Sequence, residues 1–167
     1  MPHSAALPFH LRRSQDVLGA SEMTTTTERV HGVLRLDGDR LVIQWRLTRK
    51  IQTLGSGIRT DEEVEPVQEV VIPLWAVAGA GIRRPWWSFG LGLRLVLTAS
   101  DLRAFDVFAG EGGLKLSHPA KLVLRLRRQD ALAAEEFTAE LALAKAEMSL
   151  EAADDRRRLV DGEQRSE

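Results

Sequence analysis

A series of short segments in which apolar and polar residues alternate, from about Val30 to Arg127, is followed by one helical segment that begins near Asp130. Such alternation is typical of strands with one buried face. A curled antiparallel sheet has an open end, and a single helix with an apolar face can close it. The order of segments therefore predicts a mainly β fold: a partly open antiparallel barrel of about seven strands capped by one C-terminal α-helix.

The clearest predicted hairpin lies at residues 30–47. Its second strand places one apolar row inward, namely Leu41, Ile43, Trp45 and Leu47. Asp37, Gly38 and Asp39 join it to the preceding strand, and Asp-Gly supplies the positive φ that a tight turn requires. The same reasoning predicts strands at residues 67–74, 76–84, 91–98, 102–108 and 122–127. The polar stretch 49–66 is predicted to be a mobile loop or a frayed hairpin tip.

The predicted helix carries two apolar rows. The first is expected to plug the barrel and consists of Ala133, Phe137, Leu141, Ala144 and Met148. The second lies on nearly the opposite side and consists of Leu132, Ala139, Leu143, Ala146 and Leu150. Because one row is enough for docking, the second is expected to need a partner or the chain's own tail, and its five residues are the candidates for self-association.

The domain organisation follows from the same patterns. Residues 29–150 are predicted to form one domain, between a disordered N-terminal arm at 1–28 and a charged, frayed or disordered tail at 151–167. Met23 followed by four threonines resembles a natural start, so residues 1–22 are predicted to be disordered or to precede the true start. The N-terminal segment has no continuous apolar stretch, and Arg, Ala and Leu are abundant, which predicts a bacterial cytoplasmic protein.

The composition and motifs of the chain argue against most kinds of catalytic, metal and nucleic-acid-binding site. The formal net charge is -1, which provides no global field for nucleic acid, and no nucleic-acid partner is expected. The chain has no cysteine, so disulfides and thiolate ligands are excluded. No phosphate loop or nucleophile elbow is present, and the histidines lack metal-ligand spacing: His3, His10, His31 and His118. The sequence thus predicts no enzyme, no metal and no cofactor.

Several segments together resemble the bacterial pleckstrin-homology-like (PH-like) family across residues 29–149. They are GVLRLDGDRL at 32–41, VIPL at 71–74, GLRLVL at 92–97 with LRAF at 102–105, and LRLRRQD at 124–130. The resemblance implies a non-catalytic module that often self-associates. Phosphoinositide-binding members carry several basic residues at the first hairpin, whereas this turn has Asp37 and Asp39 with only Arg35 and Arg40 beside it. Inositol-phosphate binding is therefore not expected.

Arginine and tryptophan gather between two predicted strands, at Arg83, Arg84, Trp86 and Trp87. Indole combines a large apolar area with one polar N–H, so this segment is a candidate for contact with a protein partner or a lipid headgroup layer. The alternative is structural, with these tryptophans covering the barrel end. The leading function is protein interaction through self-association of the helix; the alternatives are peripheral membrane or lipid binding through this segment, and a barrel that holds an apolar ligand.

Overall fold

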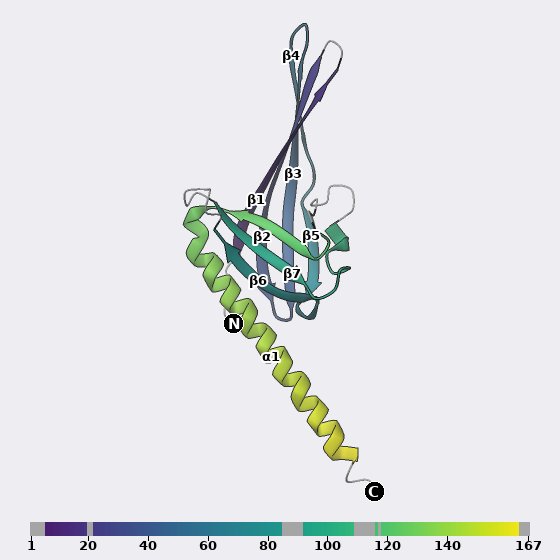
Figure 1. Ribbon diagram of the computed structural model, residues 1–167, viewed down its shortest axis with the longest axis vertical. Coiled ribbons are helices and arrows are strands. Elements are labelled where there is room, and N and C mark those ends of the chain that lie inside the picture. Colours follow the sequence, from purple (N-terminus) through teal and green to yellow (C-terminus); the bar gives the residue numbers. More distant parts are fainter. Residues whose placement is uncertain (1–5, 20–21, 85–91, 109–115, 117, 164–167) are drawn as a thin grey trace.

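The computed structural model describes residues 6–19, 22–84, 92–108, 116 and 118–163. Within these residues, eight strands form one curled, open antiparallel sheet in the order β4-β3-β2-β1-β8-β7-β6, with β5 also paired to β3, and one helix follows (Figure 1). The expected fold class, a mainly β, partly open antiparallel barrel with one C-terminal helix, is confirmed. The elements are β1 (Leu7–Leu18), β2 (Met23–Asp37), β3 (Arg40–Leu54), β4 (Ile58–Val64), β5 (Gln68–Pro73), η1 (Leu74–Ala76), β6 (Val77–Arg83), β7 (Leu93–Ala99), η3 (Asp106–Phe108), β8 (Lys121–Leu126), η4 (Arg128–Asp130) and α1 (Ala131–Glu163).

The hairpin of β2 and β3 forms as the sequence predicts. Gly38 has a φ of 59°, a left-handed conformation that glycine adopts without a Cβ clash. The inward row of β3 is buried, and its most exposed member, Leu47, is only 6% exposed. Because side chains alternate between the two faces of a strand, this register fixes which face of the sheet becomes the core.

The helix buries the row that the sequence assigns to docking. Phe137 and Leu141 are 2% and 1% exposed and belong to the same core cluster as Leu95 and Phe105. Ala133, Ala144 and Met148 are half-buried against this cluster. Burying a large apolar side chain contributes roughly 1.5–3 kcal/mol, so this face is enough to hold α1 on the sheet.

Lys145 attaches α1 to the beginning of β6. Its ammonium donates hydrogen bonds to the backbone carbonyl oxygens of Val77 and Ala78, the second at 2.9 Å. Within the described residues β6 is the last strand in the sheet order, so its outer edge has no neighbouring strand. The lysine therefore supplies hydrogen-bond donors to an otherwise open strand edge.

Replacing Lys145 with methionine is expected to lower the free energy of unfolding by about 1.5 kcal/mol, because hydrogen bonds from a charged donor are lost. Urea unfolding followed by circular dichroism measures this loss. Lys121→Met is the matched control, since Lys121 is exposed on β8, and it should change the free energy by no more than about 0.5 kcal/mol. Equal losses for the two variants would contradict the attachment.

About half of each of the strands β1, β2 and β3, together with the whole of β4, extends from the body of the sheet as a β-projection (Figure 1). The projection consists of residues 12–18, 23–29, 48–54 and 58–64. One cross-strand row in it alternates in charge, in the order Arg13, Glu28, Arg49 and Glu63. The Arg49 guanidinium lies 3.5 Å from the Glu28 carboxylate and 3.2 Å from that of Glu63. Opposite charges that face each other across strands stabilise the pairing, so ion pairs support a sheet that has no core of its own.

The projection overturns two predictions. The disordered arm predicted at residues 1–28 is wrong for the residues described, because Leu7–Leu18 is strand β1 and β2 begins at Met23. The stretch 49–66 is likewise the end of β3 with strand β4, and not a mobile loop. The physical reason is that polar residues predominate on both faces of the projection and its apolar residues, among them Leu18, Leu54 and Ile58, are exposed, so its strands lack the regular apolar alternation by which strands are recognised.

Two further expectations need correction. Residues 102–108 do not form a strand but turns and η3, although Phe105 and Phe108 are buried there. The tail predicted to be frayed or disordered from residue 151 continues as α1 to Glu163. The alanine, glutamate, arginine and leucine residues of this segment have high helix propensity, which favours continuation of the helix past the sheet.

Candidate functional site

The segment predicted to contact lipid or a partner is described only in part. Arg83 ends β6 and is exposed, whereas Trp86 and Trp87 lie outside the described residues. The Arg84 guanidinium lies 3.1 Å from a carboxylate oxygen of Glu135 on α1. A pocket of about 480 Å³ adjoins this ion pair and is lined by Ile82, Arg84, Glu135 and Thr138. Since Glu135 neutralises one of the two arginines, contact with lipid through this segment stays a prediction.

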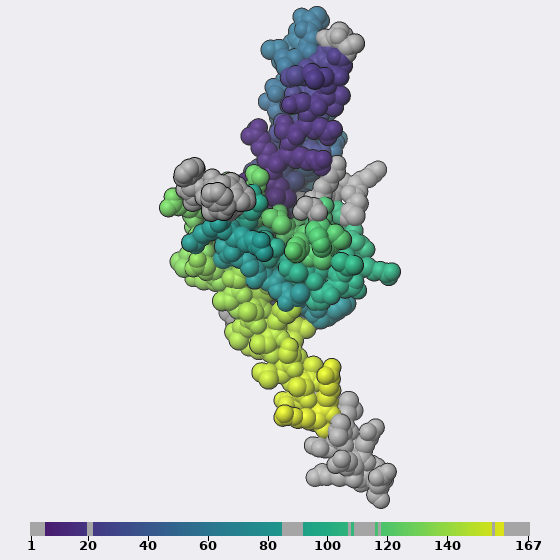
Figure 2. All heavy atoms as spheres, in the orientation of Figure 1, coloured from purple at the N-terminus to yellow at the C-terminus, as the bar shows by residue number. Residues whose placement is uncertain are grey.

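The second apolar row of α1 is exposed along its whole length. Leu132, Leu143 and Leu150 are 68%, 61% and 68% exposed, and Ala139 and Ala146 between them are exposed as well. The opposite face of α1 packs on the sheet, and the far half of the helix extends beyond it (Figure 2). The structure therefore brings the five predicted self-association residues together on one accessible face.

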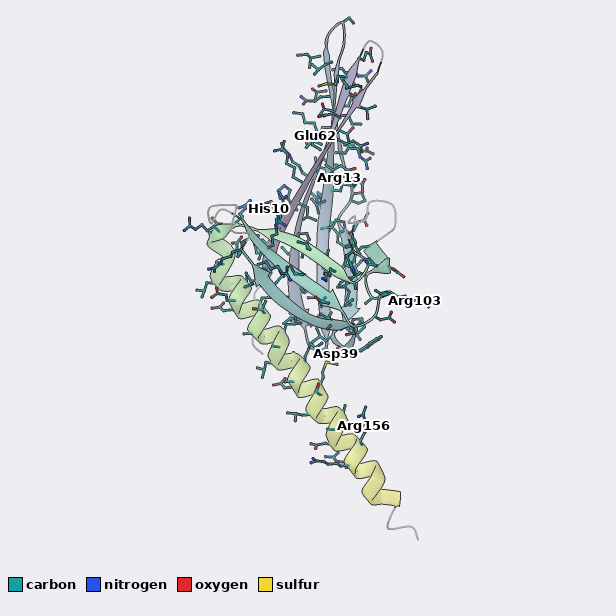
Figure 3. The ribbon with its side chains drawn as sticks, in the orientation of Figure 1. His10, Arg13, Asp39, Glu62, Arg103 and Arg156 are labelled. Carbon is teal, nitrogen blue, oxygen red and sulfur yellow. The ribbon has the colours of Figure 1, made fainter. Side chains whose placement is uncertain are left out.

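Charged residues are distributed unevenly along α1. With 3.6 residues per turn, three glutamates follow one side of the exposed apolar row: Glu136, Glu140 and Glu147. Near the far end, where Figure 3 labels Arg156, three consecutive exposed arginines follow Asp154 and Asp155 in the chain, namely Arg156, Arg157 and Arg158. With 3.6 residues per turn, Arg157 lies in line with the exposed apolar row, so the row has glutamates beside its beginning and one arginine near its far end.

The strand register also assembles a basic row that the sequence reasoning missed. The direct cross-strand partners from β6 through β7, β8, β1 and β2 to β3 are Arg83, Arg94, Arg125, His10, His31 and Arg46. Their chain neighbours Phe9, Trp45 and Leu95 are buried, so the basic row lies on the outer face of the sheet. In the part of the chain that the structure describes, none of the four arginines forms an ion pair.

The electrostatics of the basic row are unfavourable. Burial lowers the pKa of His10, and the nearby charges of Arg127, His31 and Arg125 lower the pKa further, while Asp130 acts in the opposite direction. Like charges directly opposite each other destabilise a sheet. The β-projection of the same chain pairs arginine with glutamate, whereas the arginines of the basic row form no ion pair among the described residues.

The comparisons add no relative. Comparison with known proteins finds no matching family model, curated protein or solved structure. Among the described helices none is long and apolar enough to cross a bilayer. The described residues likewise hold no group of three or more His, Asp or Glu side chains that could bind a metal ion. The functional argument therefore rests on the two surfaces above, the exposed row of α1 and the basic row.

Proposed function

We propose that the protein is a non-catalytic, PH-like binding and assembly module that pairs with a second copy of itself through α1. The observation that carries the proposal is the exposure of three leucines in one row, with Leu143 at 61% and Leu132 and Leu150 at 68%. An exposed apolar row on a helix whose opposite face is already packed is typical of an association surface.

The row fits an antiparallel helix pair. Leucines at 143 and 150 alternate with alanines at 139 and 146, and these small side chains let a second helix approach closely. In a twofold pair each helix offers the same surface to the other. A twofold axis midway between Leu143 and Leu150 places Glu136 of one copy beside Arg157 of the other. This charge complementarity favours a second copy over an unrelated partner.

Leu143→Asp is expected to weaken dimerisation at least about thirtyfold, because the change places a carboxylate in the apolar interface at a cost of about 2 kcal/mol or more. Sedimentation equilibrium over a range of protein concentrations measures the dissociation constant. Ser149→Asp is the matched control, since it adds the same charge on an exposed side of α1 away from the row, and it should leave the constant unchanged.

A charge exchange tests the orientation of the pair. Arg157→Glu should weaken dimerisation, and adding Glu136→Arg in the same chain should restore it, because the two positions face each other only in the antiparallel arrangement. A wild-type chain that stays monomeric at high concentration, or a Leu143→Asp variant that behaves like wild type, would disprove the proposed function.

A further inference from the structure

The basic row follows an arc around the outside of the curled sheet. Neighbouring strands lie about 4.8 Å apart, so six strands place the row over about 24 Å. A line of facing positive charges lowers the stability of the free protein, because each charge repels its cross-strand neighbours. The row therefore matches a ligand that brings a line of negative charges to the sheet.

We propose that the basic row binds the phosphodiester backbone of single-stranded nucleic acid. Arginine is suited to this ligand because its planar guanidinium can form paired hydrogen bonds with phosphate oxygens. Arg12 and Arg29, which face each other on β1 and β2, continue the positive surface toward the β-projection. The surface is independent of α1, so it can bind whether or not the chain dimerises.

The shape of the row favours a flexible ligand over a flat or rigid one. The basic row runs from β6 to β3, and the curl of the sheet gives these two strands different orientations (Figure 1). A planar bilayer touches only part of such an arc. Duplex DNA is stiff over about 50 nm and cannot bend around one small domain without a large energy cost. A single strand can follow the whole row.

Recognition through this row is independent of base sequence. The described outer-face residues two positions along the strands, among them Pro8, Gln44, Val96 and Val123, include no aromatic side chain on which a base could stack. Binding must then come from phosphate contacts, which release counterions and depend strongly on salt. The net charge of the chain is -1 despite this basic surface, because acidic residues elsewhere, such as those of β4, offset its positive charge.

Fluorescence anisotropy of a labelled oligothymidylate, titrated with the full chain, tests the proposal. Four arginine contacts at about -0.7 each predict a slope of about -2.8 for the logarithm of affinity against that of salt concentration. Raising salt from about 50 to about 200 mM should then weaken binding about fiftyfold. A duplex of the same length and vesicles of phosphatidylserine and phosphatidylcholine should bind more weakly than the single strand.

The double variant Arg94→Ser with Arg125→Ser should bind at least tenfold more weakly and show a slope of about -1.4. Its ligand-free melting temperature should be unchanged or higher, because repulsion in the row is relieved, and this separates a binding defect from a folding defect. Arg40→Ser with Arg103→Ser removes the same charge away from the basic row; Figure 3 labels Arg103. This control should keep the wild-type slope.

His10 gives the site a second signature. The charged groups that act on it are Arg125 of β8, Arg127 between β8 and η4, His31 of β2 and Asp130 of η4. Because the pKa of His10 is lowered in the free protein by burial and by nearby positive charges, bound phosphate favours its protonated form; affinity should rise and the slope should steepen by up to about 0.7 as the pH is lowered below the ordinary range of histidine. His10→Gln should abolish this pH dependence and leave the affinity near pH 8 unchanged.

Several outcomes would overturn the proposal. They are no binding of oligothymidylate at low salt, an unchanged slope for the Arg94 and Arg125 double variant, or tighter binding to duplex or vesicles than to the single strand. Leu143→Asp, which lies outside the basic row, should bind oligothymidylate with the same slope as wild type. Failure of the dimer and failure of this site are therefore distinguishable.

Discussion

Phe137→Ala is expected to lower the free energy of unfolding by about 3–5 kcal/mol, the range for removing a buried aromatic ring. Phe137 is 2% exposed and lies one turn from Leu141, so its removal leaves a cavity where α1 closes the barrel. Since small domains have a total stability of about 5–15 kcal/mol, the loss is a large part of what holds the fold. Urea unfolding monitored by circular dichroism measures it.

Two variants accompany this experiment. Phe137→Leu keeps most of the apolar volume and should cost less than about 1.5 kcal/mol. Leu132→Ala removes an exposed side chain on the opposite face of the same helix and should lie within about 0.5 kcal/mol of wild type when measured on the monomer. If Phe137→Ala were no worse than Leu132→Ala, the buried docking face of α1 would be refuted.

Gly32→Ala is expected to destabilise the protein by about 2–3 kcal/mol, although it adds only one methyl group. Gly32 lies on β2 between Phe9 of β1 and Trp45 of β3, which are its direct cross-strand partners. A Cβ at this position would overlap the Phe9 ring and the backbone carbonyl oxygen of Gln44. The carbonyl belongs to the sheet and cannot move aside, so the strands themselves must shift.

Gly81→Ala is the matched control, because Gly81 is also a strand glycine but a Cβ there meets nothing within 4 Å. It should leave stability unchanged or raise it slightly, since alanine restricts the unfolded chain. Adding Phe9→Leu to Gly32→Ala should recover part of the loss by removing the ring from the contact. Thermal unfolding of all the variants gives the coupling between positions 9 and 32. Equal effects of the two glycine substitutions would contradict the crowding at Gly32.

The fold was predictable where burial imposes a pattern. The inward row of β3 and the docking row of α1 showed their periods because each contacts the core on one side. The β-projection showed no such period, because both of its faces are largely exposed to solvent and its apolar and polar residues need not alternate. Residues 102–108 were wrongly predicted to form a strand because they are rich in apolar residues. Leu102 is 60% exposed while Phe105 and Phe108 are buried, and this burial occurs without strand geometry.

The two candidate surfaces also differed in whether they could be predicted from the sequence. The exposed row of α1 was found from the sequence because its members are separated by three to seven positions on a single helix. The basic row was not found, because His10 and Arg125 are far apart in the sequence and become neighbours only through the pairing of β1 with β8. Such a non-local register cannot be deduced from the spacing of arginines along the chain.

The length of α1 has a consequence for how the protein responds to its own concentration. From Glu151 onward no residue of the helix belongs to the core cluster, and the described side chains there are exposed. A helical stretch of this length is only marginally stable by itself in water. Burial of Leu150 against a second molecule would stabilise it by mass action. If the chain forms the proposed dimer, dilution would shorten the helix as it separates the copies, and the secondary structure of the chain would depend on its concentration.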